Sequence, residues 1–356
     1  MDKAIGLDPG TAFFQTAEFE EGDKVSYQTI RNAFVELPHT EDVESILKNN
    51  GWKWVKDKEE NKYYVIGEDA LRVSNIFPGI ELRRPMKDGV LNKDEEKKTI
   101  VFQEIIDSTL GKAQGKNSFV CTCISSPPAD GSQDSVNHSF RLKSMLSKNG
   151  WNVNVIEEAM AVIYAENPKA IDDSGVELNN TGIAISFGGG RTNVVFSYKK
   201  MKIIGFSISR SGDWLDQKVS EATGVTISQA ISKKEKKLDF TKEQDDEVLL
   251  AYDAYMTALL EYIFGIFAKK FKEVKGGQYD FPLEIVLAGG TSVPKGFDNK
   301  VKEVLSGLQL PFEVKSVRRA IDPRNSVVKG LLLLAAAAAK KAKSNKDDDI
   351  SKMLGE

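Results

Sequence analysis

A short turn near the start of the chain carries a carboxylate, a glycine and a hydroxyl directly after an apolar strand. The three residues are Asp8, Gly10 and Thr11, and the strand begins at Ala4. Gly10 allows the backbone to approach a ligand closely because it has no Cβ. Successive N–H groups in such a turn form a concave site for an anion such as phosphate, and Asp8 is suited to hold a water of Mg²⁺, which prefers oxygen ligands. Taken alone, the pattern also fits an ordinary β-hairpin.

The same pattern of strand, glycine turn and strand occurs a second time in the chain. The segment Thr181–Phe196 contains Gly188, Gly189 and Gly190 between two apolar runs. A third piece, Ile285–Ser292, is a buried strand that leads into a Gly-Gly turn. The repetition predicts two similar halves that face one nucleotide.

Length and composition limit the class of protein. A chain of 356 residues with 41% apolar residues favours two domains with sizeable cores. The formal net charge of −3 gives no reason to expect direct nucleic acid binding. The first residues lack the pattern of a secretory signal, and no run of about 18 apolar residues predicts a membrane span. The nearest candidate, Gly330–Ala339, is interpreted as a buried helix.

The two cysteines, Cys121 and Cys123, lie two residues apart in an apolar run, and therefore on one face of a strand. A metal-binding or redox pair is one interpretation, and two buried, reduced thiols are the favoured one. So few cysteines in a chain of this length predict a reducing, cytoplasmic location.

Alternating strands and helices position the first turn and predict an α/β fold. Strands are expected at 4–7, 13–19, 25–30, 119–124 and 153–156, with a helix at 135–149. Residues 32–84 differ in character and are expected to form a small insert. In that insert Trp52 and Trp54 are interpreted as core residues, with an exposed patch for a partner as the alternative.

The second half repeats this order around a larger helical region. Strands are expected at 181–187, 192–196, 202–209 and 281–288, and residues 214–275 are expected to be mostly helical. The apolar stripe of 245–271 predicts core packing, and Lys233–Lys237 is interpreted as a solvated helix face rather than a binding patch. A final helix is expected from Ser326 to about Lys343, followed by a charged, disordered tail.

Five motifs occur in the order found in the actin-like ATPase superfamily, which the chain resembles over residues 4–340. They are Gly6–Thr11 (first phosphate loop), Ile156–Ala161 (first connecting helix), Ile185–Asn193 (second phosphate loop), Ala288–Phe297 (adenosine loop) and Asp322–Gly330 (second connecting helix). Two further segments, Arg84–Val90 and Ser209–Asp216, are close to those of MreB and MamK. The chain thus resembles most the bacterial actin homologues of the MreB, MamK and ParM type.

The resemblance implies an α/β, actin-like fold. Such a fold has two related RNase H-like α/β domains with a nucleotide cleft between them, each with a small subdomain insert. The implied boundaries are 1–32, 85–150 and 326–343 for subdomain IA, 33–84 for IB, 151–213 and 276–325 for IIA, 214–275 for IIB, and 344–356 for the disordered tail.

The resemblance also implies roles for the residues at the matching positions. Asp8 is expected to hold Mg²⁺ through water, and Glu158 to position or activate the attacking water. ATP or ADP is expected to contact Gly10, Thr11, Gln15, Ser186, Gly188, Gly189, Gly190, Thr192, Gly212, Asp213, Gly289, Gly290 and Thr291. Catalysis would rest on positioning, on a metal that neutralises charge and on a held water.

Several positions depart from the superfamily pattern. Ser186 stands where an Asp usually helps to hold the Mg²⁺ water shell, and Asn193 stands where an acidic residue is common. Ala159 replaces a proline, and Gln15 stands where actin has a lysine. Loss of an electrostatic partner slows hydrolysis by a factor on the order of a hundred. A slow ATPase, or one active only in the polymer, is therefore expected.

Three functions are compatible with this pattern. The favoured one is a cytoskeletal filament, a homopolymer of paired protofilaments in which ATP favours head-to-tail association and hydrolysis weakens it; heterologous contacts that do not close produce such a filament. The second is a metabolite kinase of the same fold, for which no substrate-pocket motif is evident. The third is a hydrolysis-impaired module that regulates another filament. The neutral residues Ser186 and Asn193 are compatible with this alternative.

The filament hypothesis leaves the cargo open. Residues 89–98 are too charged to insert into a membrane, so direct membrane attachment is disfavoured. Adaptor proteins that the sequence does not name are expected to link the filament to DNA, to an organelle or to cell shape.

Overall fold

The computed structural model describes residues 2–21, 24–77, 79–172, 174–274, 279 and 281–354, without the side chains of 96–98 and 345–354. The chain divides into two compact units. Unit 1 comprises Met1–Cys123, Ser135–Val155 and Leu331–Glu356, and unit 2 comprises Ile124–Asp134 and Ile156–Gly330. The expected subdomain boundary at 275–276 and the last two residues of the expected tail lie outside the described residues.

Unit 1 is built on a five-stranded sheet in the order β10-β9-β1-β2-β3. Its strands are β1 (Ala4–Pro9), β2 (Phe13–Phe19), β3 (Val25–Arg31), β9 (Phe119–Ile124) and β10 (Asn152–Glu157). Strand β1 pairs antiparallel with β2 and parallel with β9. The carboxyl ends of β1 and β9 therefore lie at the same end of the sheet. The apolar faces of α3 (Thr99–Leu110) and α4 (Val136–Lys148) supply the rest of this core.

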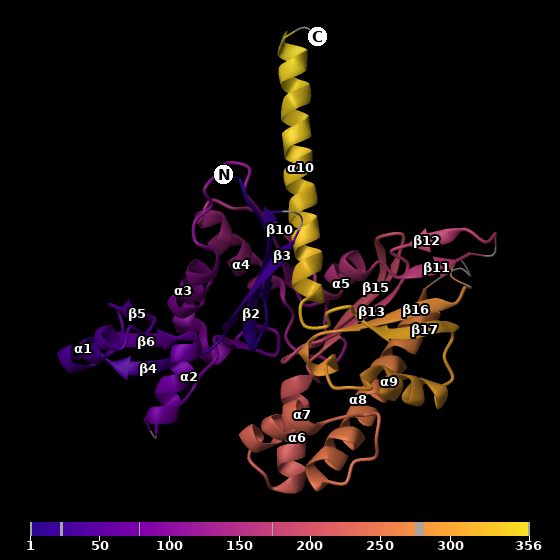
Figure 1. Ribbon diagram of the computed structural model, residues 1–356, viewed down its shortest axis with the longest axis horizontal. Helices are drawn as coiled ribbons and strands as arrows, with labels where there is room; N and C mark the ends of the chain where they lie inside the picture. Colours follow the sequence, from indigo (N-terminus) through magenta and orange to yellow (C-terminus); the bar gives the residue numbers. More distant parts are fainter. Residues whose placement is uncertain are drawn as a thin grey trace. The chain divides into compact units, whose positions relative to one another are not determined.

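The insert of unit 1 has a sheet of its own, in the order β4-β6-β5 (Figure 1, indigo). Its elements are β4 (Phe34–Pro38), α1 (Glu41–Asn49), β5 (Trp54–Asp57), β6 (Lys62–Ile66) and α2 (Gly67–Ile76). Trp52 and Trp54 are partly buried against a cluster that includes Leu47 and Tyr63, which confirms their interpretation as core residues. A short hairpin of β7 (Met86–Lys87) and β8 (Val90–Leu91) and a 3₁₀ helix, η2 (Lys93–Lys98), follow.

Unit 2 has a five-stranded sheet in the order β15-β14-β13-β16-β17. Its strands are β13 (Gly182–Phe187), β14 (Thr192–Tyr198), β15 (Met201–Ile208), β16 (Leu283–Ala288) and β17 (Val314–Arg319). The first three strands in the chain pair antiparallel, whereas β13, β16 and β17 run parallel. Unit 1 has the same strand order, so the two halves are similar, as the repeated glycine turns predict.

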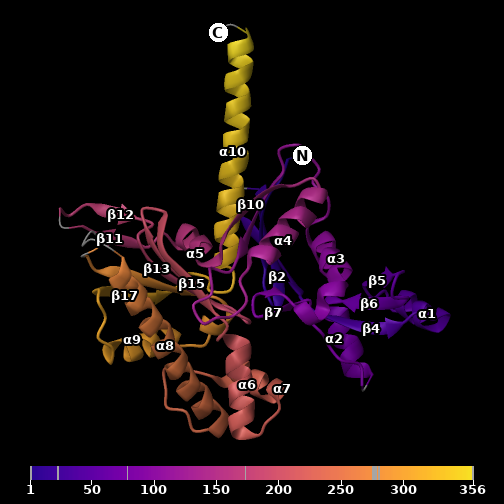
Figure 2. The ribbon, with the colours of Figure 1, turned by 180° about the vertical axis from the view of Figure 1, so that it is seen from behind.

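Helices and one hairpin surround the sheet of unit 2. They are α5 (Glu158–Glu166), α6 (Gly212–Thr223), α7 (Ile227–Lys237), α8 (Glu247–Glu273), α9 (Phe297–Ser306) and the 3₁₀ turn η3 (Gly290–Ser292). Helix α5 packs on β13 and β14, and α6, α7 and α8 pack on one another (Figure 1). The hairpin of β11 (Lys169–Ile171) and β12 (Glu177–Asn179) contacts β16. Figure 2 shows this hairpin at the far left.

Helix α8 is, among the described residues, the one helix long and apolar enough to cross a membrane by length and composition. The expectation that Gly330–Ala339 comes nearest to a span is therefore wrong. The apolar side chains of α8, among them Met256, Leu260 and Phe264, are buried in the core of unit 2. The helix thus has the core packing that the apolar stripe predicts.

Two other expectations differ from the structure. Helix α10 (Ser326–Leu354) continues past Lys343 through residues expected to be disordered. It extends from the alanine-rich stretch 335–342, whose residues are strong helix formers. In the run Lys233–Lys237, Lys236 and Lys237 are exposed as expected. Lys234 differs, because its ammonium lies 2.6 Å from an Asp216 oxygen and its side chain is 13% exposed. Burial raises the pKa of the Asp216 carboxyl, and the Lys234 ammonium opposes that rise.

Gly330 lies where α10 contacts α5 in unit 2. A Cβ at this position would be 1.9 Å from the Ala161 carbonyl oxygen and 2.6 Å from its carbon. Only glycine therefore permits the two helices to approach this closely.

We expect Gly330→Ala to lower the free energy of unfolding by about 1–3 kcal/mol, because overpacking forces the two backbones apart. Urea denaturation measures this change. Gly265 in α8 is the matched control, because a Cβ there would have no neighbouring atom within 4 Å; Gly265→Ala should stabilise the protein by up to about 1 kcal/mol. Equal effects of the two substitutions would contradict the packing argument.

Candidate functional site

The turn between β1 and β2 keeps the predicted carboxylate and glycine at the end of β1. Asp8 pairs with Gln15 across the hairpin. A Cβ on Gly10 would lie 2.7 Å from the Phe13 carbonyl oxygen, so the turn requires glycine. The Gly10 carbonyl accepts a hydrogen bond from Asn32 Nδ2 at 3.0 Å, and Asn32 is fully buried. Asn32 thus fixes the turn, a role that the sequence did not reveal.

A cysteine lies beside the Asp8 carboxylate. The parallel register of β1 and β9 places Leu7 opposite Thr122, so the next residues along, Asp8 and Cys123, are neighbours. Cys123 Sγ donates to Asp8 Oδ1 at 3.4 Å. Burial raises the pKa of the Asp8 carboxyl to about 6, and the thiol hydrogen bond opposes the rise. Cys121 and Cys123 are both buried and neither is in a disulfide, which confirms two buried thiols, but one of them contacts a predicted site residue.

Thr11 joins this turn to the segment Arg84–Val90. Its Oγ1 accepts a hydrogen bond from the Gly89 N–H at 3.0 Å, and Thr11 is buried. A hydroxyl that accepts in this way still has its own proton to donate. Thr11 therefore holds the segment in place and keeps a donor for a ligand.

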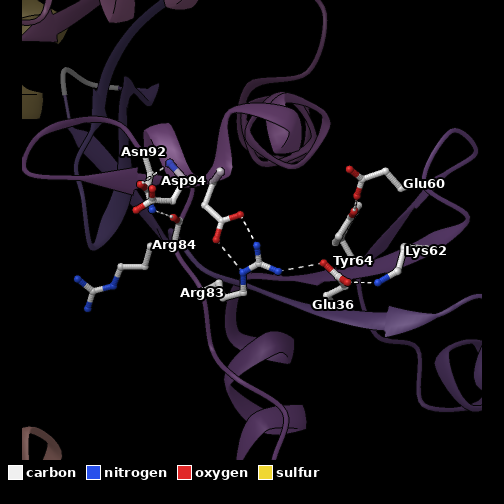
Figure 3. A network of polar contacts seen from close by, with 9 residues as sticks. Glu36, Glu60, Lys62, Tyr64, Arg83, Arg84, Asn92 and Asp94 are labelled. Carbon is white, nitrogen blue, oxygen red and sulfur yellow. Dashed lines mark hydrogen bonds and ion pairs between the residues drawn. The ribbon is translucent and has the colours of Figure 1, made fainter.

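A polar network anchors the same segment to the small sheet of unit 1. The Arg83 guanidinium donates to both carboxylate oxygens of Glu95 and, at 2.9 Å, to Glu36. Glu36 also pairs with Lys62 of β6 (Figure 3). These charges satisfy one another in a half-buried setting, so the start of the segment is fixed on both sides.

In unit 2 three separate segments meet at the carbonyl oxygen of Gly188. This oxygen accepts hydrogen bonds from the Gly212 N–H at 3.1 Å, from Thr291 Oγ1 at 3.0 Å and from Ser211 Oγ. The Asp213 N–H donates to the next carbonyl, that of Gly189, at 2.8 Å. The glycine turn, the start of α6 and the loop after β16 therefore form one cluster.

The cluster is too crowded for side chains at two of its glycines. A Cβ on Gly212 would lie 2.7 Å from Thr291 Oγ1 and 3.2 Å from the Gly188 oxygen. A Cβ on Gly289, whose φ is +92°, would lie 2.3 Å from the Phe187 carbonyl oxygen. Both positions need glycine for space, and Gly289 also needs it for its backbone conformation.

Two hydrogen-bonding patterns in the glycine turn bear on ligand binding. Thr192 is fully buried, and its hydroxyl donates to the Arg210 carbonyl at 2.9 Å. This hydrogen bond links the end of the glycine turn to the segment that precedes α6. In the part of the chain that the structure describes, the N–H groups of Gly189 and Gly190 donate to no protein acceptor. Such adjacent N–H groups form an anion-binding nest.

The Glu158 carboxylate, at the start of α5, is held by the two residues that depart from the superfamily pattern. Ser186 Oγ donates to Glu158 Oε1 at 2.7 Å, and Asn193 Nδ2 donates to Glu158 Oε2 at 2.8 Å. Ser186 and Asn193 are directly opposite each other in the pairing of β13 and β14. Glu158 itself is half-buried, so its carboxylate is oriented and still reachable by water.

The structure thus brings most predicted site residues together within their own units. In unit 1 these are Asp8, Gly10, Thr11 and Gln15; in unit 2 they are Glu158, Ser186, Gly188, Gly189, Gly190, Thr192, Gly212, Asp213, Gly289 and Thr291. Gly290 lies in the same loop as Thr291 and is exposed. Sequence reasoning did not select Asn32, Cys123, Ser211 or Asn193 as site residues. The pairing of Asn193 with Ser186 across the hairpin is the feature by which the sequence could have identified Asn193 as a site residue.

Burial raises the pKa of the Cys121 thiol to about 12, from an ordinary value of 9.0. Because the thiolate is the reactive form, we expect iodoacetamide at pH 8 to label Cys121 about a thousandfold more slowly in the folded protein than in the urea-unfolded chain. Mass spectrometry of labelled peptides measures both rates. Rapid labelling of native Cys121 would contradict the burial of this strand.

Comparison with known proteins identifies the fold and the family. No curated protein sequence matches the chain. The crystal structure of MreB5 of Spiroplasma citri bound to ADP is 17% identical, with a TM-score of 0.60 over 96% of this chain and 99% of that chain. MreB5 of the same organism bound to AMPPNP is also 17% identical, with a TM-score of 0.62 over 97% and 99%. The chain therefore has an MreB-like, actin-like fold. The Volactin family model matches residues 3–337, and the chain belongs to the Volactin family.

Proposed function

We propose that this protein binds ATP, polymerises into cytoskeletal filaments in an ATP-dependent way, and hydrolyses ATP slowly to control filament stability. The observation that carries nucleotide binding is the cluster around the Gly188 carbonyl in unit 2. The segments that resemble the second phosphate loop and the adenosine loop converge there with the start of α6. The actin-like fold supports the further step to filaments.

The glycine turn offers the chemistry that a phosphate group needs. The N–H groups of Gly189 and Gly190 donate to no acceptor within the described residues, and the hydroxyl of Thr291 lies beside them on the Gly188 carbonyl. An anion at this nest would receive hydrogen bonds from backbone donors that are already positioned. The turn in unit 1 offers Gly10 and the proton of Thr11 in the same way.

The residues present suit a magnesium ion that keeps most of its water. Among the described residues no group of three or more His, Cys, Asp or Glu side chains could hold a metal. Mg²⁺ does not require such a cage, because it binds through one or two carboxylates, several waters and substrate phosphates. Asp8 supplies one carboxylate, and bound Mg²⁺ would neutralise charge on the phosphates.

Glu158 is the residue placed to hold the attacking water. It begins α5, its carboxylate is half-buried and both of its oxygens are oriented by hydrogen bonds. Hydrolysis is expected to be slow because Asp8 is the one predicted site carboxylate left for the metal, position 186 being a neutral serine. A positioned carboxylate of this kind contributes on the order of 10²–10⁴ in rate.

A hydrolysis-impaired regulatory module is the second candidate function. The neutral pair of Ser186 and Asn193 favours it, since both positions often carry an acid in the superfamily. Such a module would bind ATP without forming filaments of its own.

The decisive experiment follows polymer and phosphate in the same sample. Purified protein is incubated with Mg-ATP, Mg-ADP or no nucleotide, then pelleted and viewed by electron microscopy while released phosphate is recorded. We expect filaments in Mg-ATP with phosphate release delayed behind assembly. Tight ATP binding without polymer would favour the regulatory module, and absence of nucleotide binding would refute both.

Gly212→Ala tests the cluster itself. The new Cβ must displace Thr291 Oγ1 or the Gly188 carbonyl, so we expect the dissociation constant for ATP to rise roughly 10- to 100-fold through misplaced loops. Gly307→Ala is the matched control, because the nearest atom to its Cβ position is the Val304 oxygen at 3.6 Å. Unchanged affinity in a folded Gly212→Ala protein would remove this cluster from the nucleotide site.

A further inference from the structure

We propose that Ser186 and Asn193 are positioning residues that act through Glu158, holding its carboxylate as a neutral pair of donors. The inference rests on the proposed function, because it concerns the hydrolysis step. It changes the meaning of the two departures from the superfamily pattern. Ser186 is assigned to the water-holding carboxylate rather than to the metal.

The geometry shows a clamp made by one hairpin. Ser186 on β13 and Asn193 on β14 are cross-strand partners, so their side chains project from the same face of the sheet. They reach different oxygens of one carboxylate, at 2.7 Å and 2.8 Å. Ser186 is 1% exposed and Asn193 is fully buried, so water does not compete for these donors.

The orientation of the Asn193 amide is fixed by the backbone behind it. The Ser126 N–H donates to Asn193 Oδ1 at 3.0 Å. A backbone N–H can only donate, so the oxygen of the amide must face Ser126 and the nitrogen must face Glu158. Ser126 is itself anchored, because its carbonyl accepts from Ser207 Oγ at 2.7 Å. The Asn193 side chain can therefore only donate a hydrogen bond to Glu158.

Charge explains why neutral residues are suited to these two positions. An Asp at either position would place a second carboxylate within hydrogen-bonding distance of Glu158. Two carboxylates this close cannot both remain ionised without a compensating cation. Serine and asparagine instead donate hydrogen bonds to Glu158. They stabilise its charged form, which is the form that accepts a proton from water.

The clamp also leaves Glu158 able to act. A carboxylate offers about four lone-pair sites on its two oxygens, and the two hydrogen bonds of the clamp use one on each oxygen. Glu158 is half-buried, so solvent reaches part of the residue. The proton of the Ser186 hydroxyl is engaged by Glu158, and its neutral oxygen would bring no negative charge to a metal.

A double-mutant cycle on the full chain tests the clamp. Ser186→Ala and Asn193→Ala are made alone and in a Glu158→Ala background, and phosphate release and the dissociation constant for ATP are measured with Mg-ATP. Each single substitution should slow phosphate release about 10- to 100-fold, as expected for one hydrogen bond to a charged group, with little change in ATP affinity. In the Glu158→Ala background neither should slow release further. Additive losses would overturn the inference.

Unfolding in urea without nucleotide provides a readout that does not depend on activity. Ser186→Ala should lower the urea midpoint in the wild-type chain because it removes a hydrogen bond to Glu158. It should raise the midpoint in the Glu158→Ala chain, where the buried hydroxyl has lost its acceptor. The same sign in both backgrounds would contradict the clamp, even if the protein proved not to hydrolyse ATP. Absence of phosphate release in the wild-type chain would count against the proposed function instead.

Two further variants distinguish the clamp from the simple loss of a buried hydroxyl and from the loss of a metal ligand. Ser197→Ala removes a buried serine of β14 whose hydroxyl donates to the Asn180 carbonyl at 3.0 Å, so it controls for the hydroxyl and should leave phosphate release unchanged. Ser186→Asp should slow phosphate release, because it places a carboxylate against Glu158. Faster release in Ser186→Asp would show that position 186 is a lost metal ligand, and would overturn the inference.

Discussion

The Gly188 carbonyl oxygen is the contact on which the candidate site of unit 2 depends. It gathers donors from two other segments, through Ser211, Gly212 and Thr291. Three donors reach one oxygen only if the backbones come very close, and this explains the glycines around it. The requirement for glycine at 212 and 289 is therefore a packing constraint. Within the described residues, the nearby Gly189 and Gly190 amides donate to no protein acceptor.

The two halves share a topology but differ in the type of residue at one equivalent position, two residues before the turn glycine. Asp8 and Ser186 both precede their turn glycine by two residues. Each lies opposite an amide-bearing residue in the strand register, Gln15 and Asn193 respectively. In each turn a Cβ on the glycine would meet the carbonyl three residues later, at 2.7 Å in one and 2.8 Å in the other. Unit 1 keeps a carboxylate there, whereas unit 2 has a neutral donor.

The neighbours of these two positions explain the difference. On the adjacent parallel strand Asp8 meets the thiol of Cys123, whereas Ser186 meets Ala288, which has no polar side chain. Ser186 instead turns to Glu158 on α5, a residue that already carries the negative charge in that half. Each half therefore holds one carboxylate near its turn, with a side-chain donor to steady it. The chemistry proposed for the protein, one carboxylate for metal and one for water, follows from this division.

The sequence by itself determined the parts of the fold that local chemistry controls. The glycine turns, the strands that flank them and the amphipathic helices follow from residue spacing and from what glycine alone permits, and the repeated pattern predicted the two similar halves. The resemblance supplied Asp8, Glu158 and the glycines as candidate site residues. Only the tertiary structure decided which residues far apart in the chain are in contact. The pairing of Lys234 with Asp216, the thiol beside Asp8 and the hold of Ser186 and Asn193 on Glu158 depend on which strands and helices are neighbours. Residue spacing carries no information about such neighbours, because they are set by sheet order and by packing between elements more than a hundred residues apart in some cases.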